Sequence, residues 1–178
     1  MTSLMIATTI PLLDNLYHIL KEKQVDPFAM FMLVGFVLSI LALFLGGDEK
    51  VLLLKESLVT GVMGLIFIGS LFFSKPLIYY FAIRFTTSGG SAEKSAFEKS
   101  WELPYFRFVM RLMTAVWGAS LLAEAIIKTI LVFRLSVSAF LVVSQLVFYG
   151  TIGLTIAWTV LYRKHAKKRI QRLKKQLA

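Results

Sequence analysis

Long apolar stretches, separated by short polar connections, dominate the pattern of this sequence. Five of them occupy residues 3–20, 28–46, 51–73, 105–133 and 137–162. A helix needs about 17–25 mostly apolar residues to cross the hydrocarbon core of a bilayer. The pattern therefore predicts an all-α, polytopic transmembrane bundle of about five spans, forming one domain over residues 1–162.

The third apolar segment, 51–73, carries small side chains at helical spacing. They form two pairs of residues four apart, Ser57/Gly61 and Thr60/Gly64. Small residues allow two transmembrane helices to approach each other closely. We expect this segment to pack tightly against another span, with Glu56 near the membrane interface.

Residues 74–104 interrupt the apolar pattern with a polar connection. Its first part, 75–85, is aromatic and flanked by cations, which is typical of an interfacial helix at the level of the lipid headgroups. The sequence TTSGGS at 86–91 predicts a flexible link. Residues 95–102 predict a short helix that places Phe97 next to Trp101.

The composition agrees with a membrane protein. Of the 178 residues, 57% are hydrophobic and only 17% are charged, whereas soluble domains have roughly 25% charged residues. The chain has no cysteine, which excludes disulfides and thiolate chemistry, and its two histidines, His18 and His165, lie in different regions. We expect no metal site and no cofactor. Motifs for a nucleotide loop, a nucleophile elbow or a zinc protease are also missing, so we expect no enzymatic activity.

The net charge of +10 is concentrated at the C-terminus. Residues 163–178 form a basic tail without a single acid, in which Ala166, Ile170, Leu173 and Leu177 make a narrow apolar stripe. A basic amphipathic helix of this kind is expected to lie on anionic phospholipid headgroups. Nucleic-acid binding is the rival interpretation, but interleaved aromatic residues are lacking and we expect no nucleic-acid partner. A tail that only anchors the topology is a third interpretation.

Candidate lipid-binding residues are the cations of the tail and two arginines near the start of the fourth segment. They are Arg107, Arg111, Arg163, Lys164, Lys167, Lys168, Arg169, Arg172, Lys174 and Lys175.

The distribution of cations predicts the orientation. Lys and Arg accumulate on the cytoplasmic side of membrane proteins. With the C-terminus inside, sixteen of the twenty cations fall on the cytoplasmic side, and only Lys50, Lys55, Lys128 and Arg134 fall outside. The five spans then place the N-terminus outside.

Two charged residues, Glu124 and Lys128, interrupt the fourth apolar segment one helical turn apart. The order, with Glu first, favours an ion pair. A structural ion pair that joins helices is the favoured interpretation, and a proton or cation site is the alternative. Lys128 has the length to extend toward the outer surface, whereas Glu124 does not.

A second polar cluster lies in the first apolar segment. Asp14 and His18 share a helical face that should point into the bundle or a hydrated cavity. An Asp–His proton relay is one interpretation. A polar seam near the cytoplasmic end is the favoured one.

Four strings in the sequence resemble a bacterial family. They are VLLLKESLVTGVMGLI at 51–66, KPLIYYFAIRF at 75–85, FRFVMRLMTAVWG at 106–118 and YRKHAKKR at 162–169. With the order of the segments, they resemble an uncharacterised bacterial family of multi-pass membrane proteins. That family is distantly similar to intracellular septation protein A, an inner-membrane protein linked to envelope synthesis and division.

The resemblance implies a function and a location. It implies a non-enzymatic, envelope- or division-associated protein of the bacterial inner membrane, with a second copy or envelope proteins as partners. The alternative is a small-solute or ion transporter that uses Glu124 and the Asp14/His18 face, and a membrane enzyme is the least favoured. Members of the family have one more hydrophobic helix before the segment that matches 3–20, so the resemblance implies a bundle that lacks a first span.

The topology predicts which positions react with impermeant thiol reagents in intact cells. Because the chain has no cysteine, single substitutions provide clean probes. We expect Gly47→Cys and Ser136→Cys to be labelled, and Ser91→Cys and Ala178→Cys to be protected until the cells are lysed. Labelling of Ser91→Cys without lysis would contradict the orientation.

Overall fold

The structure, a computed structural model, describes residues 27–44, 46–86 and 91–176, which are almost entirely helical and contain no β-strand. Its α-helices are α2 (Pro27–Phe44), α3 (Glu49–Gly69), α4 (Leu77–Thr86), α5 (Ser91–Lys99), α6 (Pro104–Arg134) and α7 (Val137–Gln176). Two 3₁₀ turns, η1 (Ser70–Phe72) and η2 (Ser100–Glu102), follow α3 and α5. The all-α prediction is confirmed for this part of the chain. The predicted first span at 3–20 lies outside the described residues.

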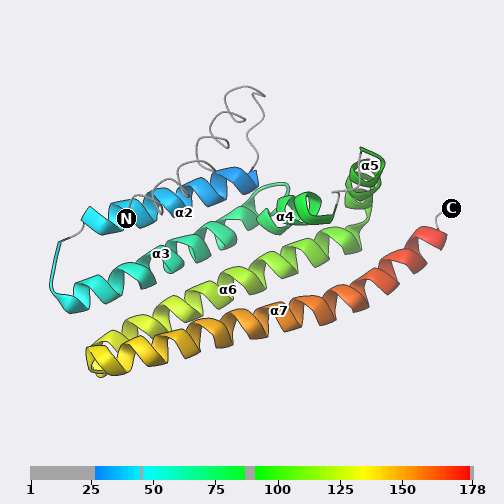
Figure 1. Cartoon of the computed structure of the whole chain (residues 1–178). Coiled ribbons are helices and arrows are strands. Elements are labelled where there is room, and N and C mark those ends of the chain that lie inside the picture. Colours follow the sequence, from blue (N-terminus) through cyan, green and yellow to red (C-terminus); the bar gives the residue numbers. More distant parts are fainter. Residues whose placement is uncertain (1–26, 45, 87–90, 177–178) are drawn as a thin grey trace.

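The four longest helices lie next to one another in the order α2, α3, α6, α7 (Figure 1). The contact between α3 and α6 is the most extensive, and α7 packs along the other side of α6. The short helices α4 and α5 lie at the end of the bundle toward which the C-terminal half of α7 runs (Figure 1). α6 is therefore the central helix of the described bundle.

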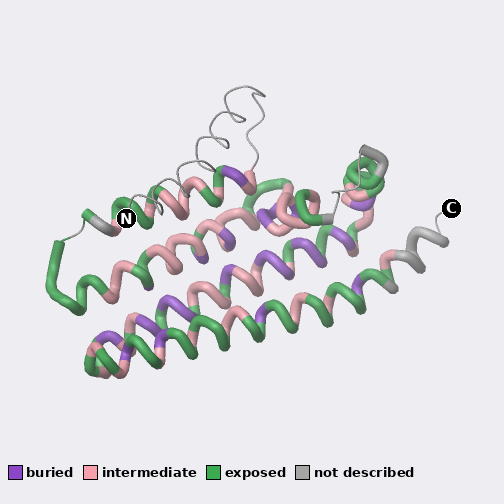
Figure 2. The backbone as a smooth tube through the Cα atoms, in the orientation of Figure 1, coloured by how far each residue is buried: buried purple, intermediate pink, exposed green. Residues whose placement is uncertain are grey.

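Within the described ranges, three helices are long and apolar enough to cross a membrane: Glu49–Phe72, Pro104–Arg134 and the Val137–Lys167 part of α7. The eighteen residues of α2 form a shorter apolar helix. Buried positions gather on α6, while the outer faces are exposed (Figure 2). Those faces carry large apolar side chains, such as Leu65 and Leu146. Apolar outer faces are what lipid requires of a spanning bundle.

Local sequence explains where α3 begins. Gly47 has a φ of +145°, a conformation that side chains other than glycine rarely adopt. Asp48 then caps the helix, because its side chain accepts a hydrogen bond from the Val51 N–H at 3.0 Å. The helix consequently starts at Glu49, two residues before the predicted boundary.

Ser70 connects the end of α3 to α4. Its hydroxyl donates to the Phe67 carbonyl at 2.7 Å and accepts from the Leu77 N–H at 3.1 Å. α4 packs against α2 and α6, and Tyr79 is only 1% exposed. The predicted aromatic helix is present, but one face of it packs into the protein. Its level relative to lipid headgroups stays a prediction.

The predicted short helix at 95–102 begins earlier, because α5 covers Ser91–Lys99 and residues 100–102 form η2. Most of the predicted link, residues 87–90, lies outside the described residues. Phe97 and Trp101 both pack against the Tyr79 ring, at centroid distances of 5.4 and 4.8 Å.

α7 continues without interruption from the last apolar segment into the basic tail. It runs for forty residues to Gln176, so the predicted boundary at residue 162 is not a break in the helix. Ala166 and Ile170, the first two residues of the predicted apolar stripe, pack against the cluster around Tyr79 and Phe106. This part of the stripe faces protein rather than lipid. Periodicity showed an apolar face but not what covers it.

Glycines set the close contact between α3 and α6. A Cβ at Gly64 would lie 3.1 Å from the Leu122 backbone nitrogen and 3.2 Å from the Gly118 carbonyl oxygen. At Gly61, a Cβ would meet the Ala125 Cβ at 3.4 Å. The prediction that small residues bring another helix close to 51–73 is confirmed.

We predict that Gly64→Ala lowers the melting temperature of the detergent-solubilised protein. The added methyl meets backbone atoms that cannot move without separating the helices, and overpacking of this kind costs about 1–3 kcal/mol. Gly153→Ala is the matched control, because a Cβ there has nothing within 4 Å. Equal melting temperatures for the two variants would contradict the close contact.

Candidate functional site

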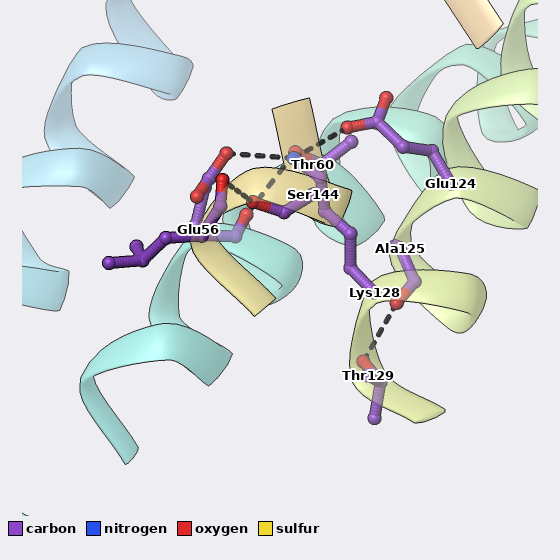
Figure 3. A network of polar contacts seen from close by, with 8 residues as sticks. Glu56, Thr60, Glu124, Ala125, Lys128, Thr129 and Ser144 are labelled. Atoms are coloured by element: carbon purple, nitrogen blue, oxygen red, sulfur yellow. Dashed lines mark hydrogen bonds and ion pairs between the residues drawn. The ribbon is translucent and has the colours of Figure 1, made fainter. Parts of the chain in front are cut away.

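A cluster of three charged side chains connects α3 to α6. Lys128 Nζ lies 2.9 Å from Glu124 Oε1 on the same helix and 2.7 Å from Glu56 Oε1 on α3. Figure 3 shows the lysine between the two carboxylates. The Glu124–Lys128 ion pair expected from the one-turn spacing is present, and it has a third member on a neighbouring helix.

The three members differ in exposure. Glu124 is fully buried and Lys128 is 1% exposed, whereas the Glu56 side chain is 57% exposed. Lys128 does not extend to the outer surface, as its length would allow. Lys128 forms one ion pair with Glu124, one turn earlier on α6, and another with Glu56 on α3. The close α3–α6 contact brings Glu56 within reach.

The charges of the cluster do not balance. One ammonium group serves two carboxylates, which leaves a formal charge of −1 when all three groups are ionised. Glu124 Oε1 is held by the ion pair, and Glu124 Oε2 has no hydrogen-bond partner in the part of the chain that the structure describes. The other neighbour of Lys128 is the Phe148 ring on α7, 5.2 Å from Nζ. Such a cluster can accept a proton or a further cation.

A cavity of about 870 Å³ extends along α6 to this cluster. Its floor is the face of α6 that carries Met110, Met113, Trp117 and Leu121. One wall is formed by α3 and α4 and the other by α7. Most of the lining is apolar, and Glu124 lies at one end, where the fully buried carboxylate is closed off.

Two polar contacts join α7 to α6 beside this cavity. Trp117 Nε1 donates a hydrogen bond to the Thr159 hydroxyl at 3.1 Å. The hydroxyls of Thr155 and Ser120 lie 2.9 Å apart. Hydrogen bonds of this kind between helices contribute to the packing of α7 on α6.

The structure does not bring the other predicted site residues to the cluster. Asp14 and His18 lie outside the described residues. Arg107, Arg111, Arg163, Lys164 and Lys167 are exposed, and Arg169 lies over the Tyr105 ring at 4.7 Å. Lys168, Arg172, Lys174 and Lys175 belong to α7, but their side chains are not described. Among the described residues, no group of three or more His, Asp or Glu side chains could hold a metal ion.

Glu56 is the functional candidate that the sequence did not reveal. It was expected at the membrane interface, and its partial exposure agrees with that position. Its pairing with Lys128 spans 72 positions in the chain. The only signal was its place beside the small residues that mark the α3 contact face.

Comparison of the chain with known protein families, with curated proteins and with solved structures found no match.

The arrangement predicts an order of stability losses. Lys128→Met should be the most destabilising single change, because it leaves two carboxylates without a cation; breaking a buried pair costs about 3–5 kcal/mol. Glu124→Gln should reduce stability less, because Lys128 still forms its ion pair with Glu56. The double variant should recover part of the Lys128→Met loss, since the remaining Glu56 is half exposed.

Thermal unfolding in detergent measures this cycle. Lys50→Met, at an exposed position in the first turn of α3, is the control and should have little effect. Additive losses in the double variant would show that Glu124 and Lys128 do not act as a pair.

Proposed function

We propose that this protein is a non-enzymatic, multi-pass protein of the bacterial inner membrane that transports a small solute or ion. Glu124 is its proton- or cation-binding group. The observation that carries the proposal is the cavity that ends at Glu124, whose Oε2 atom has no partner among the described residues.

The charge of the cluster supports this role. An uncompensated negative charge is costly in a bilayer, so a formal charge of −1 favours uptake of a proton or cation. The α7 residues at the cluster, Ser144 and Phe148, are uncharged and do not supply that charge. The sequence of α2 contains no charged residue at all. Lys128 is therefore the only cation in contact with the two carboxylates among the described residues.

The proposed topology has five spans, with α2 as the second and the C-terminus in the cytoplasm. The distribution of cations and the three long apolar helices support it. In this topology the ion cluster lies in the outer half of the membrane, with Glu124 ten residues before the end of α6. The helix α4 lies on the cytoplasmic side.

A role in envelope synthesis or division, through a second copy or envelope proteins, is the other proposal. Its support is the set of four strings quoted above. Such a scaffold should co-purify with envelope proteins, and it should do so equally well with Glu124→Gln. Loss of the partners in this variant would instead tie them to the ion cluster.

We predict that acidification protonates a buried carboxylate in the intact protein. In infrared difference spectra of proteoliposomes, the wild type should gain a carboxylic C=O band as the pH falls. Glu124→Gln should lack the component of this band that comes from a buried acid, while the other carboxyl groups of the chain still contribute theirs. Glu102→Gln, at an exposed position in η2, is the control and should keep it.

The same vesicles test transport. Proton or cation uptake driven by a membrane potential should require Glu124, and Lys128→Met should shift its pH dependence because a neighbouring cation favours the ionised carboxylate. Folded Glu124→Gln protein with wild-type uptake would refute the proposal.

A further inference from the structure

The end of the cavity opposite Glu124 carries two cations on α7, Arg163 and Lys167. They lie one helical turn apart and both are exposed. Neither has an ion-pair partner within the ranges that the structure describes. The cavity thus joins an apolar channel to a pair of unneutralised positive charges.

The apolar part of the cavity has the length of a lipid chain. From Phe106 to Trp117 along its floor, α6 rises about 16 Å at 1.5 Å per residue. One leaflet contributes about 15 Å to the hydrocarbon core. The lining over this distance is almost wholly apolar, from Met110 and Met113 on α6 to Phe81 and Ala82 on α4. The cavity is partly open, so an acyl chain can enter it.

We propose that this cavity, a groove along α6, holds one acyl chain of an anionic glycerophospholipid, whose phosphate is bound by Arg163 and Lys167. The inference goes beyond the proposed transport function and does not depend on it. It also differs from adsorption of the basic tail to a membrane surface, because it places a single lipid between helices.

Charge complementarity selects this occupant. A hydrocarbon chain suits the lining between Phe106 and Trp117, and a phosphate group suits Arg163 and Lys167 at the level where a headgroup lies. An apolar protein segment would fill the groove but leave the two cations without a counterion. A zwitterionic lipid would bring a cation of its own toward them.

Trp117 provides an internal probe, because it lines the groove. The full chain, with Trp101→Phe and Trp158→Phe to remove the other two tryptophans, is reconstituted in phosphatidylcholine nanodiscs. Brominated phosphatidylglycerol or brominated phosphatidylcholine is then added at equal mole fractions. We expect the anionic lipid to quench Trp117 at a lower mole fraction. Each cation near a membrane surface is worth up to about fivefold in affinity, so the two give up to about 25-fold.

Variants of the two cations test the headgroup site. Arg163→Gln and Lys167→Gln should each lose up to about fivefold in this preference, and together they should abolish it. Lys164→Gln removes the same charge from the adjacent position, which does not line the groove, and should keep the preference. Gel filtration and circular dichroism establish that each variant is folded, and the single variants serve if the double one is not.

Three results would overturn the proposal. Equal quenching by both lipids would show that the groove does not select an anionic headgroup. A preference that survives in the double variant would place the headgroup elsewhere. Absence of quenching by either lipid would mean that protein fills the groove. Deletion of residues 1–26, or dilution of the protein among nanodiscs, would then tell whether that protein is the N-terminal segment or a second copy.

Discussion

The close contact between α3 and α6 is the constraint on which the rest of the described bundle depends. Gly64 permits it, because any side chain there would meet the backbone of α6. This contact brings Glu56 within 2.7 Å of Lys128, so a lysine that would otherwise extend toward the surface stays buried. It also leaves α6 lining the bottom of the groove, with α3 on one side and α7 on the other. The ion cluster and the groove therefore both depend on the packing of α3 against α6.

The groove has opposite charges at its two ends and an apolar wall between them. Its Glu124 end carries excess negative charge, and its Arg163 end carries excess positive charge. The wall between them is apolar. A molecule held along its length would lie in an electric field directed along the groove. Water is a poor occupant of the apolar middle, since a buried water needs several polar partners. This arrangement favours amphipathic or chain-like molecules over freely hydrated ions in that stretch.

Local spacing predicted much of the fold and two of the three residues of the ion cluster. The Glu124–Lys128 pair follows from an interval of four on one helix, and the helices over 27–44, 104–134 and 137–162 follow from apolar runs. Glu56 could not be assigned to the cluster, because its role depends on the register between two helices that are far apart in sequence. The apolar stripe of the tail shows the same limit: the interval of Ala166 and Ile170 predicts an apolar face, while the aromatic cluster around Tyr79 that covers these two residues is a tertiary feature.

The uninterrupted α7 has a mechanical consequence. Forty residues of helix measure about 60 Å, twice the roughly 30 Å of the hydrocarbon core. The segment long and apolar enough to cross a membrane ends at Lys167, and the helix continues for about 14 Å to Gln176. Ala166 and Ile170 pack against the cluster around Tyr79 and Phe106, so this end of α7 is held against α4 and α6. Because α7 has no break that could absorb a rotation, a change of its tilt in a thicker or thinner bilayer has to be shared by the helices packed against it.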